Sequence, residues 1–283
     1  MKPFSLNIKG ELRCFDTPAV MGILNVTPDS FFESSRAMSG DDIAARVAEL
    51  AAAGADFIDI GAFSTRPGAS FVSEEEELAR LEPAVTIASR VAPRAIISVD
   101  TFRASVARKA VGDWGAHMVN DISGGNIDPD MFDTVAELNV PYVLTHSRGD
   151  IADMMDRTDY ESVIRDVLAE IGERLGRLSL LGVNDVIIDP GFGFSKTLQQ
   201  NYQLLADLNI FGLFHRPILV GVSRKSMISQ VLGTSADQSL NGTTVLNTLA
   251  LDRGASILRV HDPSPAIQAV KIYQRLQSCQ VSE

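Results

Sequence analysis

The sequence has little cysteine: among its 283 residues, only Cys14 and Cys279 carry a thiol. Two cysteines exclude the disulfide scaffold of a small secreted protein, and they are too few for a cysteine-based zinc site. We therefore expect both thiols to be reduced, in a reducing compartment.

Basic residues are also scarce. The chain has 25 Lys and Arg against 36 Asp and Glu, which gives a formal net charge of −11 and a pI near 4.9. A nucleic-acid-binding protein normally carries a basic stripe, so we expect no nucleic-acid partner. No apolar run reaches the roughly 18 residues of a membrane span, and the N-terminus lacks the regions of a signal peptide. The composition predicts a globular, cytoplasmic protein without membrane association.

Motifs of several common enzyme classes are missing. The sequence has no Walker A loop, no G-x-G-x-x-G that opens a helix, no H-E-x-x-H and no nucleophile elbow. Gly191-Phe192-Gly193 is a lone G-x-G after an apolar run, which is a weak signal for any dinucleotide. The usual mononucleotide, metalloprotease and serine-hydrolase assignments therefore have no support.

Short apolar runs alternate with longer amphipathic ones along most of the chain. The short runs are rich in Val and Ile, as is typical of parallel strands covered on both faces. We expect eight strands, at Ala19–Asn25, Asp56–Gly61, Ala95–Val99, Ala116–Asp121, Val140–Thr145, Asp185–Asp189, Arg216–Val222 and Ser256–Val260. Between them, apolar residues at helical spacing (for example Ile43, Val47 and Leu50) predict helices that pack on the sheet. The acidic run Glu74–Glu77 is expected to be a solvated first helical turn.

This alternation predicts an α/β fold, a single (β/α)8 TIM barrel that forms one domain over residues 1–283. An open, doubly wound sheet is the competing architecture, because sequence alone does not show closure. The leader alternates apolar and polar residues around Lys9-Gly10, so residues 1–18 are expected to form a β-hairpin that covers one end. Cys14 is expected at a buried hairpin position.

Polar and Gly/Pro-rich clusters follow the ends of the predicted strands. They are Asn25–Ser30, Ser64–Gly68, Asp100–Thr101, Asn120–Gly125, His146–Gly149, Asp189–Phe194, Ser223–Ser226 and Arg259–Asp262. Loops need polar turn residues in any case, and one or two clusters would fit that explanation. All eight would meet at the carboxyl end of a closed barrel, which is where enzymes of this fold keep their active sites.

The residue types indicate a ligand. Asp100, Asn120 and Asp189 end three strands, and buried carboxylates require strong hydrogen-bond donors, so these residues suit a flat heterocycle with amino and ring N–H groups. Lys225 would neutralise a carboxylate. Taken singly, each has a structural role such as helix capping as an equal alternative.

A second group is cationic. Arg66, Arg259 and His261 lie on the second and eighth loops, which are neighbours in a closed barrel, and arginine binds phosphate oxygens in a bidentate manner. The group predicts an anion site, although a single loop arginine is more often a surface charge. His117 and His215 have no such company and are interpreted as structural.

At these residues the sequence resembles the dihydropteroate synthases, enzymes of the folate pathway. The resemblance runs from about Met21 to Tyr273. It is carried by MGILNVTPDSF at Met21–Phe31, STRPG at Ser64–Gly68, DPGFGF at Asp189–Phe194, SRKS at Ser223–Ser226 and RVHD at Arg259–Asp262. These motifs occur in the order and at the approximate spacing found in that family.

The resemblance implies a cytoplasmic homodimeric transferase. It would condense 6-hydroxymethyl-7,8-dihydropterin diphosphate with 4-aminobenzoate, releasing diphosphate, and it would be a sulfonamide target. By motif position, Asp100, Asn120, Asp189 and Lys225 would bind the pterin, and Asn25 would help hold Mg²⁺ on the diphosphate. Arg259 and His261 would bind that diphosphate, while Thr65, Arg66, Pro67, Ser223 and Phe194 would shape the aminobenzoate pocket. Asp100, Lys225, Arg259 and His261 would take part in catalysis.

Three departures from the family pattern stand out. Phe32–Arg36 replaces a Ser-Asp-Gly-Gly stretch, Thr145-His146-Ser147 replaces Met-His-Met, and Ser195 stands where glycine or alanine is common. The altered first loop and Thr145 motivate an alternative, a pterin-binding paralogue without catalytic activity. A pterin-dependent methyltransferase and a class I aldolase that uses Lys225 as a Schiff base are more remote alternatives.

Overall fold

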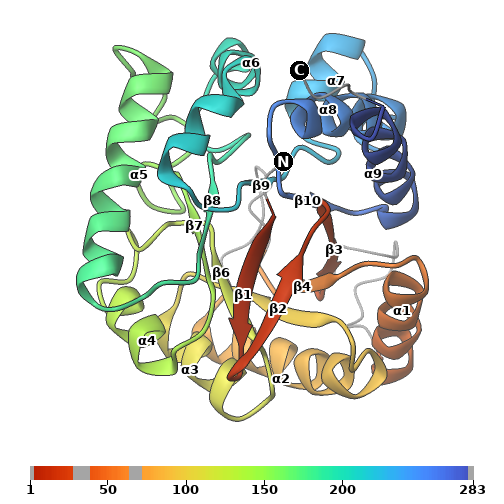
Figure 1. Cartoon of the computed structure of the whole chain (residues 1–283). Coiled ribbons are helices and arrows are strands. Elements are labelled where there is room, and N and C mark those ends of the chain that lie inside the picture. Colours follow the sequence, from red (N-terminus) through yellow and green to blue (C-terminus); the bar gives the residue numbers. More distant parts are fainter. Residues whose placement is uncertain (1–2, 28–38, 64–71, 280–283) are drawn as a thin grey trace.

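A computed structural model describes residues 3–27, 39–63 and 72–279 (Figure 1). Within them, eight strands pair in parallel in the order β8-β7-β6-β5-β4-β3-β10-β9. Their bounds are β3 Ala19–Asn25, β4 Phe57–Gly61, β5 Ile96–Asp100, β6 Met118–Asp121, β7 Tyr142–Thr145, β8 Val186–Asp189, β9 Leu219–Val220 and β10 Ile257–Val260. A bridge from Ile188 to Ile218 joins the two ends of this order. The chain is therefore a TIM barrel, and the open-sheet alternative is wrong.

The strand predictions hold except at β9. A run over Arg216–Val222 was expected, whereas the strand covers only Leu219–Val220. Pro217 lacks an N–H donor, so a regular ladder does not begin there. The flanking carbonyls still bond to the neighbouring strands: Pro217 accepts from Ile188 N at 2.9 Å, and Ile218 accepts from Ser256 N at 2.8 Å.

Helices surround the barrel. They are α1 Gly40–Ala52, α2 Glu74–Val91, α3 Ala104–Gly112, α4 Met131–Leu138, α5 Val163–Leu180, α6 Leu198–Ala206, α7 Ser226–Leu232, α8 Leu240–Asp252 and α9 Pro263–Gln277, with a 3₁₀ helix at Leu208–Phe214. Glu74–Glu77 form the first turn of α2 as predicted, with Glu74, Glu75 and Glu76 exposed. The prediction that Glu77 is solvated is wrong, because its side chain is fully buried and pairs with Arg103 and Thr101. None of the helices in the described ranges is long and apolar enough to cross a membrane.

Side chains alternate between two cores, as strand geometry requires. One core lies between the sheet and the helices and takes, for example, Ile58 and Ile60 of β4. The other lies inside the barrel and takes Phe57 of β4 with its counterparts on the other strands, which are Met21, Ile96, Met118, Val143, Ile187, Leu219 and Ile257. These inward residues stand near the amino ends of their strands. They fill that half of the barrel with apolar side chains.

An antiparallel hairpin covers this amino end, as the sequence predicts. Strands β1 (Phe4–Ile8) and β2 (Glu11–Phe15) pair through a turn in which Lys9 and Gly10 have φ of 52° and 88°. Leu6 and Ile8 of β1 pack into the inner core, and Figure 1 shows both strands in front of the barrel. The prediction for Cys14 is wrong: it is exposed, because β2 turns most of its side chains to solvent.

Candidate active site

The same inward face becomes polar at the carboxyl ends of the strands. Two residues beyond Phe57 on β4 stands Asp59, and the equivalent positions include Asn120, Asp189 and Arg259 on β6, β8 and β10. Asp100 and Asn25 are the last residues of β5 and β3 and lie two residues further along the same inward face. Because side chains two residues apart point to the same side of a strand, these groups converge inside the barrel mouth.

A cavity of about 270 Å³ opens at this end. Among the residues that line it are seven of the predicted site residues, namely Asn25, Asp100, Phe194, Ser223, Lys225, Arg259 and His261. Asn120 and Asp189 are not among its lining residues: they are buried, 2% and 6% exposed, and bond to Asp59 and to the Gly191 N–H. A larger cavity of about 770 Å³ lies at the amino end, beside the hairpin and the residues that precede β8, β9 and β10. The predicted groups converge on the smaller cavity.

Arg259 links two acids at the barrel mouth. Its Nε donates to Asp59 Oδ2 at 2.7 Å, and its Nη2 donates to Asp100 Oδ2 at 2.6 Å. Asn120 Nδ2 donates to the same Asp59 oxygen at 2.9 Å. The two acids raise the pKa of Arg259, so the guanidinium stays charged despite its burial. These bonds engage two of the five N–H donors that a guanidinium carries.

Opposing effects act on the pKa of Asp100. Burial raises its pKa to about 7, Arg259 opposes that shift, and the charge of Asp59 adds to it. The carboxylate therefore titrates near neutrality while it remains in contact with a cation. A ligand that adds positive charge beside Asp100 would favour its ionised form.

Buried Asp189 and half-buried Lys225 influence each other's charge state. Burial raises the pKa of Asp189, and the charge of Lys225 opposes this shift. Burial lowers the pKa of Lys225 to about 8, and Asp189 counteracts it. The Lys225 ammonium donates to the carbonyl of Phe192 and lies 4.4 Å from the centroid of the Phe194 ring. The loop after β8 thus meets the loop after β9 through this lysine.

His261 and Ser223 lie beside this pair. His261 Nδ1 and Ser223 Oγ are 3.1 Å apart, and the His261 backbone N–H donates to the same hydroxyl at 3.2 Å. Arg224, between Ser223 and Lys225, pairs with Asp262 at 2.8 Å. The predicted serine and histidine are therefore held together, and a second ion pair fixes the loops that carry them.

Asn25 is the predicted metal ligand. In the described part of the chain, no group of three or more His, Cys, Asp and Glu side chains could hold a metal ion. Mg²⁺ commonly takes one or two protein ligands and completes its shell with water and substrate phosphate. The amide oxygen of Asn25, at the edge of the cavity, fits a Mg²⁺ that is held mainly by a diphosphate.

The structure does not describe all of the predicted residues. Thr65, Arg66 and Pro67 fall outside the described residues, as does the altered first-loop stretch Phe32–Arg36. His117 has the structural surroundings expected of it: its Nδ1 accepts from Ile97 N at 2.9 Å, and burial lowers its pKa to about 4.

Sequence reasoning missed several groups. Asp59 interrupts the apolar run of β4, and a carboxylate inside a buried strand is itself a signal for a paired charge. Lys196 lies in the loop between β8 and α6 and is buried at 7% exposure. Arg259, the partner of Asp59, and His146, a partner of Lys196, come from distant segments, so no local pattern identifies these contacts.

Comparison with known proteins assigns the family. Residues 21–261 match the family described as pterin binding enzyme. Over 266 residues, the chain is 41% identical to a dihydropteroate synthase of Haemophilus influenzae, covering 93% of this chain and 96% of that protein. The chain belongs to the pterin-binding family of dihydropteroate synthases.

Solved structures of the family share the whole barrel. A Xanthomonas albilineans dihydropteroate synthase with 4-aminobenzoic acid has a TM-score of 0.88 at 38% identity, over 98% of this chain and 99% of that one. A Yersinia pestis dihydropteroate synthase with a sulfonamide drug complex has a TM-score of 0.89 at 37% identity, over 98% and 100%. The chain also matches plant proteins called folate synthesis bifunctional protein, of which it spans about half (55% of one from Arabidopsis thaliana). Family membership favours the synthase hypothesis over the methyltransferase and aldolase alternatives.

The buried pair Asp59–Arg259 predicts a measurable effect on stability. Asp59→Ala leaves a buried guanidinium and the Asn120 amide without this partner, so the free energy of unfolding should fall by about 3 kcal/mol. Asp59→Asn keeps an acceptor oxygen and should lose less. Urea unfolding followed by circular dichroism measures both.

A matched surface pair is the control. Glu161 and Arg165 also form an ion pair, at 2.7 Å, but their side chains are 88% and 66% exposed. Water and salt screen such pairs, so Glu161→Ala should leave the unfolding curve unchanged. Equal losses for Asp59→Ala and Glu161→Ala would show that the Asp59 contacts do not stabilise the barrel mouth.

Proposed function

We propose that the described cavity is where this chain joins 6-hydroxymethyl-7,8-dihydropterin diphosphate to 4-aminobenzoate, with 7,8-dihydropteroate and diphosphate as products. The observation that carries this proposal is the set of buried or half-buried acids and cations around one barrel mouth, namely Asp59, Asp100, Asp189, Lys225 and Arg259. Family membership supports it. So does the bound 4-aminobenzoic acid in the description of the Xanthomonas relative.

The pterin ring would bind to the acidic side of the mouth. A pterin presents an amino group, ring N–H donors and a carbonyl, and the carboxylates of Asp100 and Asp189 with the amide of Asn120 offer the complementary acceptors and donor. Lys225 would donate to a ring acceptor while it neutralises Asp189. Because the acids are buried, their hydrogen bonds to the ring are not weakened by competing water.

The diphosphate would bind to the cationic side. Arg259 and His261 line the same cavity as Asn25, and Arg66 belongs to a predicted loop outside the described residues. When bound, Mg²⁺ would neutralise diphosphate charge, with Asn25 supplying an amide oxygen. Positive groups placed where negative charge develops lower the barrier for departure of the leaving group.

The reaction would proceed by departure of diphosphate, followed by amine attack. The bond between the pterin methylene carbon and the diphosphate oxygen breaks, and both electrons leave with the diphosphate. An aromatic amine is a weak nucleophile, so stabilisation of the cationic carbon by Asp100 matters more than activation of the amine. The amine lone pair then forms the new C–N bond, and the nitrogen releases a proton.

The aminobenzoate would occupy the outer part of the cavity. Phe194 and Ser223 line it, and Thr65, Arg66 and Pro67 are proposed to complete it. The Phe194 ring lies against Lys225, so the two substrates would meet across this side chain. The sulfonamide drug in the description of the Yersinia relative supports the same assignment.

We also propose a cytoplasmic homodimer in which residues 1–283 act as one unit. The helices α7, α8 and α9 lie together in Figure 1. They expose large apolar side chains, which are Val231, Leu232, Leu240, Val245, Leu249, Ile272 and Leu276, between 38% and 71% exposed. Such a concentration of exposed apolar residues is typical of an interface.

Turnover with purified protein tests the function. With pterin diphosphate, 4-aminobenzoate and Mg²⁺, the chain should form dihydropteroate, and omission of any one reactant should stop the reaction. Asp189→Ala and Lys225→Ala should each lower kcat/KM by at least about 100-fold, since each leaves a buried charge and an unpaired substrate group. Full activity in either folded variant would refute the site assignment. Pterin binding without turnover in the wild type would support the non-catalytic paralogue instead.

The Lys225 ammonium predicts the alkaline side of the pH profile. Its pKa is lowered to about 8 by burial and by Arg259, while Asp189 and Asp100 oppose the shift. The group is charged below this pH and neutral above it, so kcat/KM for the pterin diphosphate should fall tenfold per pH unit above about pH 8. Lys225→Arg stays charged, and its weaker activity should show no such decline. The same decline in Lys225→Arg would assign it to another group.

The interface proposal predicts a change of mass in solution. Light scattering should give twice the 30.5 kDa chain mass for the wild type. Val245→Glu with Ile272→Glu places charges on the apolar face and should give monomers. Leu180→Glu, at the end of α5 and 90% exposed, should remain dimeric. A wild-type monomer, or a dimer that survives the double substitution, would reject this interface.

A further inference from the structure

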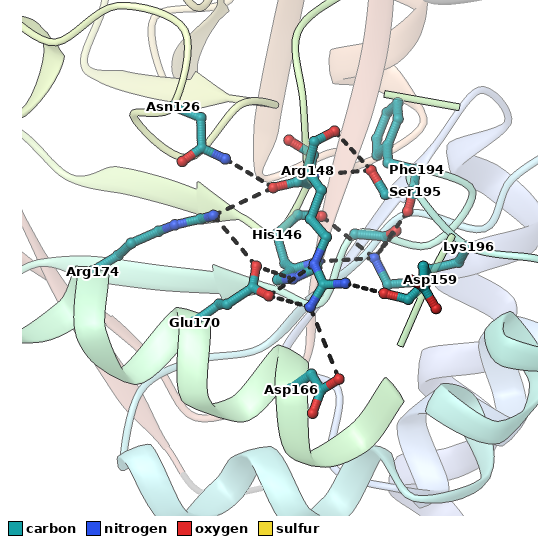
Figure 2. Close-up of polar contacts among 12 residues, drawn as sticks. Asn126, His146, Arg148, Asp159, Asp166, Glu170, Arg174, Phe194, Ser195 and Lys196 are labelled. Atoms are coloured by element: carbon teal, nitrogen blue, oxygen red, sulfur yellow. Dashed lines mark hydrogen bonds and ion pairs between the residues drawn. The ribbon is translucent and has the colours of Figure 1, made fainter. Parts of the chain in front are cut away.

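A buried lysine holds the loop after β8 from behind. Lys196 is only 7% exposed, and its Nζ lies 3.0 Å from Gly191 O, 2.9 Å from Phe194 O and 3.0 Å from His146 Nδ1. The carbonyl of His146 is a fourth, longer contact at 3.5 Å. An ammonium group has three N–H donors, and the three short contacts are all acceptors. Figure 2 shows the contacts of Lys196 with His146, which follows β7, and with Phe194 of its own loop.

A chain of hydrogen bonds continues from Lys196 through His146 to Glu170 of helix α5. Because Lys196 donates to His146 Nδ1, the other ring nitrogen, Nε2, carries the proton and donates to Glu170 Oε2 at 3.0 Å. Burial lowers the pKa of His146 to about 3, which keeps the ring neutral in this tautomer. Burial alone would raise the pKa of Glu170, but hydrogen bonds from His146 and Arg148 lower it to about 2. Arg148 Nε donates to the same carboxylate at 2.8 Å (Figure 2).

The backbones of the two loops are also in close contact. Gly191 has a φ of 76°, and a Cβ at this position would lie 1.9 Å from His146 O. Ser195 has a φ of 51°, a left-handed conformation that favours glycine, but its hydroxyl accepts from Arg148 N at 2.9 Å and donates to Arg148 O at 3.1 Å. These bonds account for the serine at this position and fix the loop at its far end.

This loop builds one wall of the cavity. Gly191 N donates to Asp189 Oδ1 at 2.7 Å, and the Phe192 carbonyl accepts from Lys225. Gly193 and Phe194 line the cavity, whereas Lys196 lies behind them. The two Lys196 contacts, with the carbonyls of Gly191 and Phe194, therefore lie on either side of Phe192, whose carbonyl accepts from Lys225.

We propose that Lys196 is a positioning residue for the pterin site: its ammonium fixes the carbonyls of Gly191 and Phe194, and thereby sets the Asp189 carboxylate and the Phe192 carbonyl against Lys225. This assignment rests on the proposed function. Burial lowers the pKa of Lys196 to about 7, because burying a charge is costly, and an apolar side chain of similar length would fill the same space without that cost. The charged group is retained where three acceptors from two loops must be held at fixed positions.

The test compares Lys196→Met with the wild type and with Lys109→Met, a matched control on the exposed side of α3. The readouts are the Kd of 6-hydroxymethylpterin by calorimetry and the steady-state kinetics with pterin diphosphate. Loss of the ammonium should raise the pterin Kd at least about tenfold and lower kcat/KM by about 100-fold, because small misplacements of binding groups are costly. Lys109→Met should change neither.

The outcomes separate positioning from stability and from the reaction itself. If folded Lys196→Met has a lower melting temperature but wild-type Kd and kcat/KM, Lys196 is merely structural and the proposal is overturned, while the proposed function stands. A wild type that binds pterin without turnover would overturn the proposed reaction, and the Kd comparison would still decide on Lys196. A wild type that does not bind pterin would overturn both.

A second variant decides the matter if Lys196→Met does not fold. Glu170, on α5, has a side chain that is 26% exposed. It contacts His146 Nε2, the ring nitrogen opposite the one that Lys196 contacts. Glu170→Gln removes the charge that orients Arg148 and His146 but leaves the buried lysine in place. We expect a rise of about threefold or more in the pterin Kd, and an unchanged Kd would overturn the proposal.

Discussion

The guanidinium of Arg259 binds two carboxylates inside the barrel mouth, and the rest of the site depends on this contact. Asp59 and Asp100 come from neighbouring strands that run side by side, so without a cation between them their charges would repel in a region that excludes water. The charge of Lys225 likewise favours the ionised form of Asp189. The charges of Asp59, Asp100 and Asp189 are therefore opposed by those of Arg259 and Lys225, and the mouth is polar without being strongly charged of one sign.

The barrel separates its two ends by the character of one inward face. Residues at the amino ends of the strands, such as Phe57 and Ile96, form an apolar plug together with Leu6 and Ile8 of the hairpin. Residues further along the same faces are charged or carry amides. Because both sets lie on the same side of each strand, the fold places the ligand-binding groups at one end without a separate binding domain.

The loops that complete this end are held by contacts remote from the cavity. Arg148, Glu170, His146 and Lys196 connect α5 to the loops after β7 and β8. This network lies behind the cavity wall and contacts the loop that carries Gly193 and Phe194. Such supporting contacts are what keep a preorganised site accurate when its ligand is absent.

The departures from the family pattern differ in how far the structure explains them. Ser195 gains two hydrogen bonds to Arg148 that offset its left-handed backbone. Ser147 donates from its hydroxyl to Ile122 O at 2.9 Å, so a polar side chain is satisfied at a buried position. Both changes are accommodated by local bonds, and the barrel remains the same.

By itself, the sequence determined the order of strands and helices, the hairpin and most of the site, because strand and helix periods and the order of motifs are local properties of the chain. Closure of the strands into a barrel was decided by the tertiary structure, through the bridge from Ile188 to Ile218. The strands from Ala19 to Asp189 and the residues Asn25, Asp100 and Lys225 needed no knowledge of contacts. Only the tertiary structure decided how the charges pair: Arg259 with Asp59, 200 residues away, and Lys196 with His146, 50 residues away. It also decided that Glu77 is buried and Cys14 exposed. The free energy of a buried charge depends on the partner that the fold brings to it, and no local pattern contains that partner.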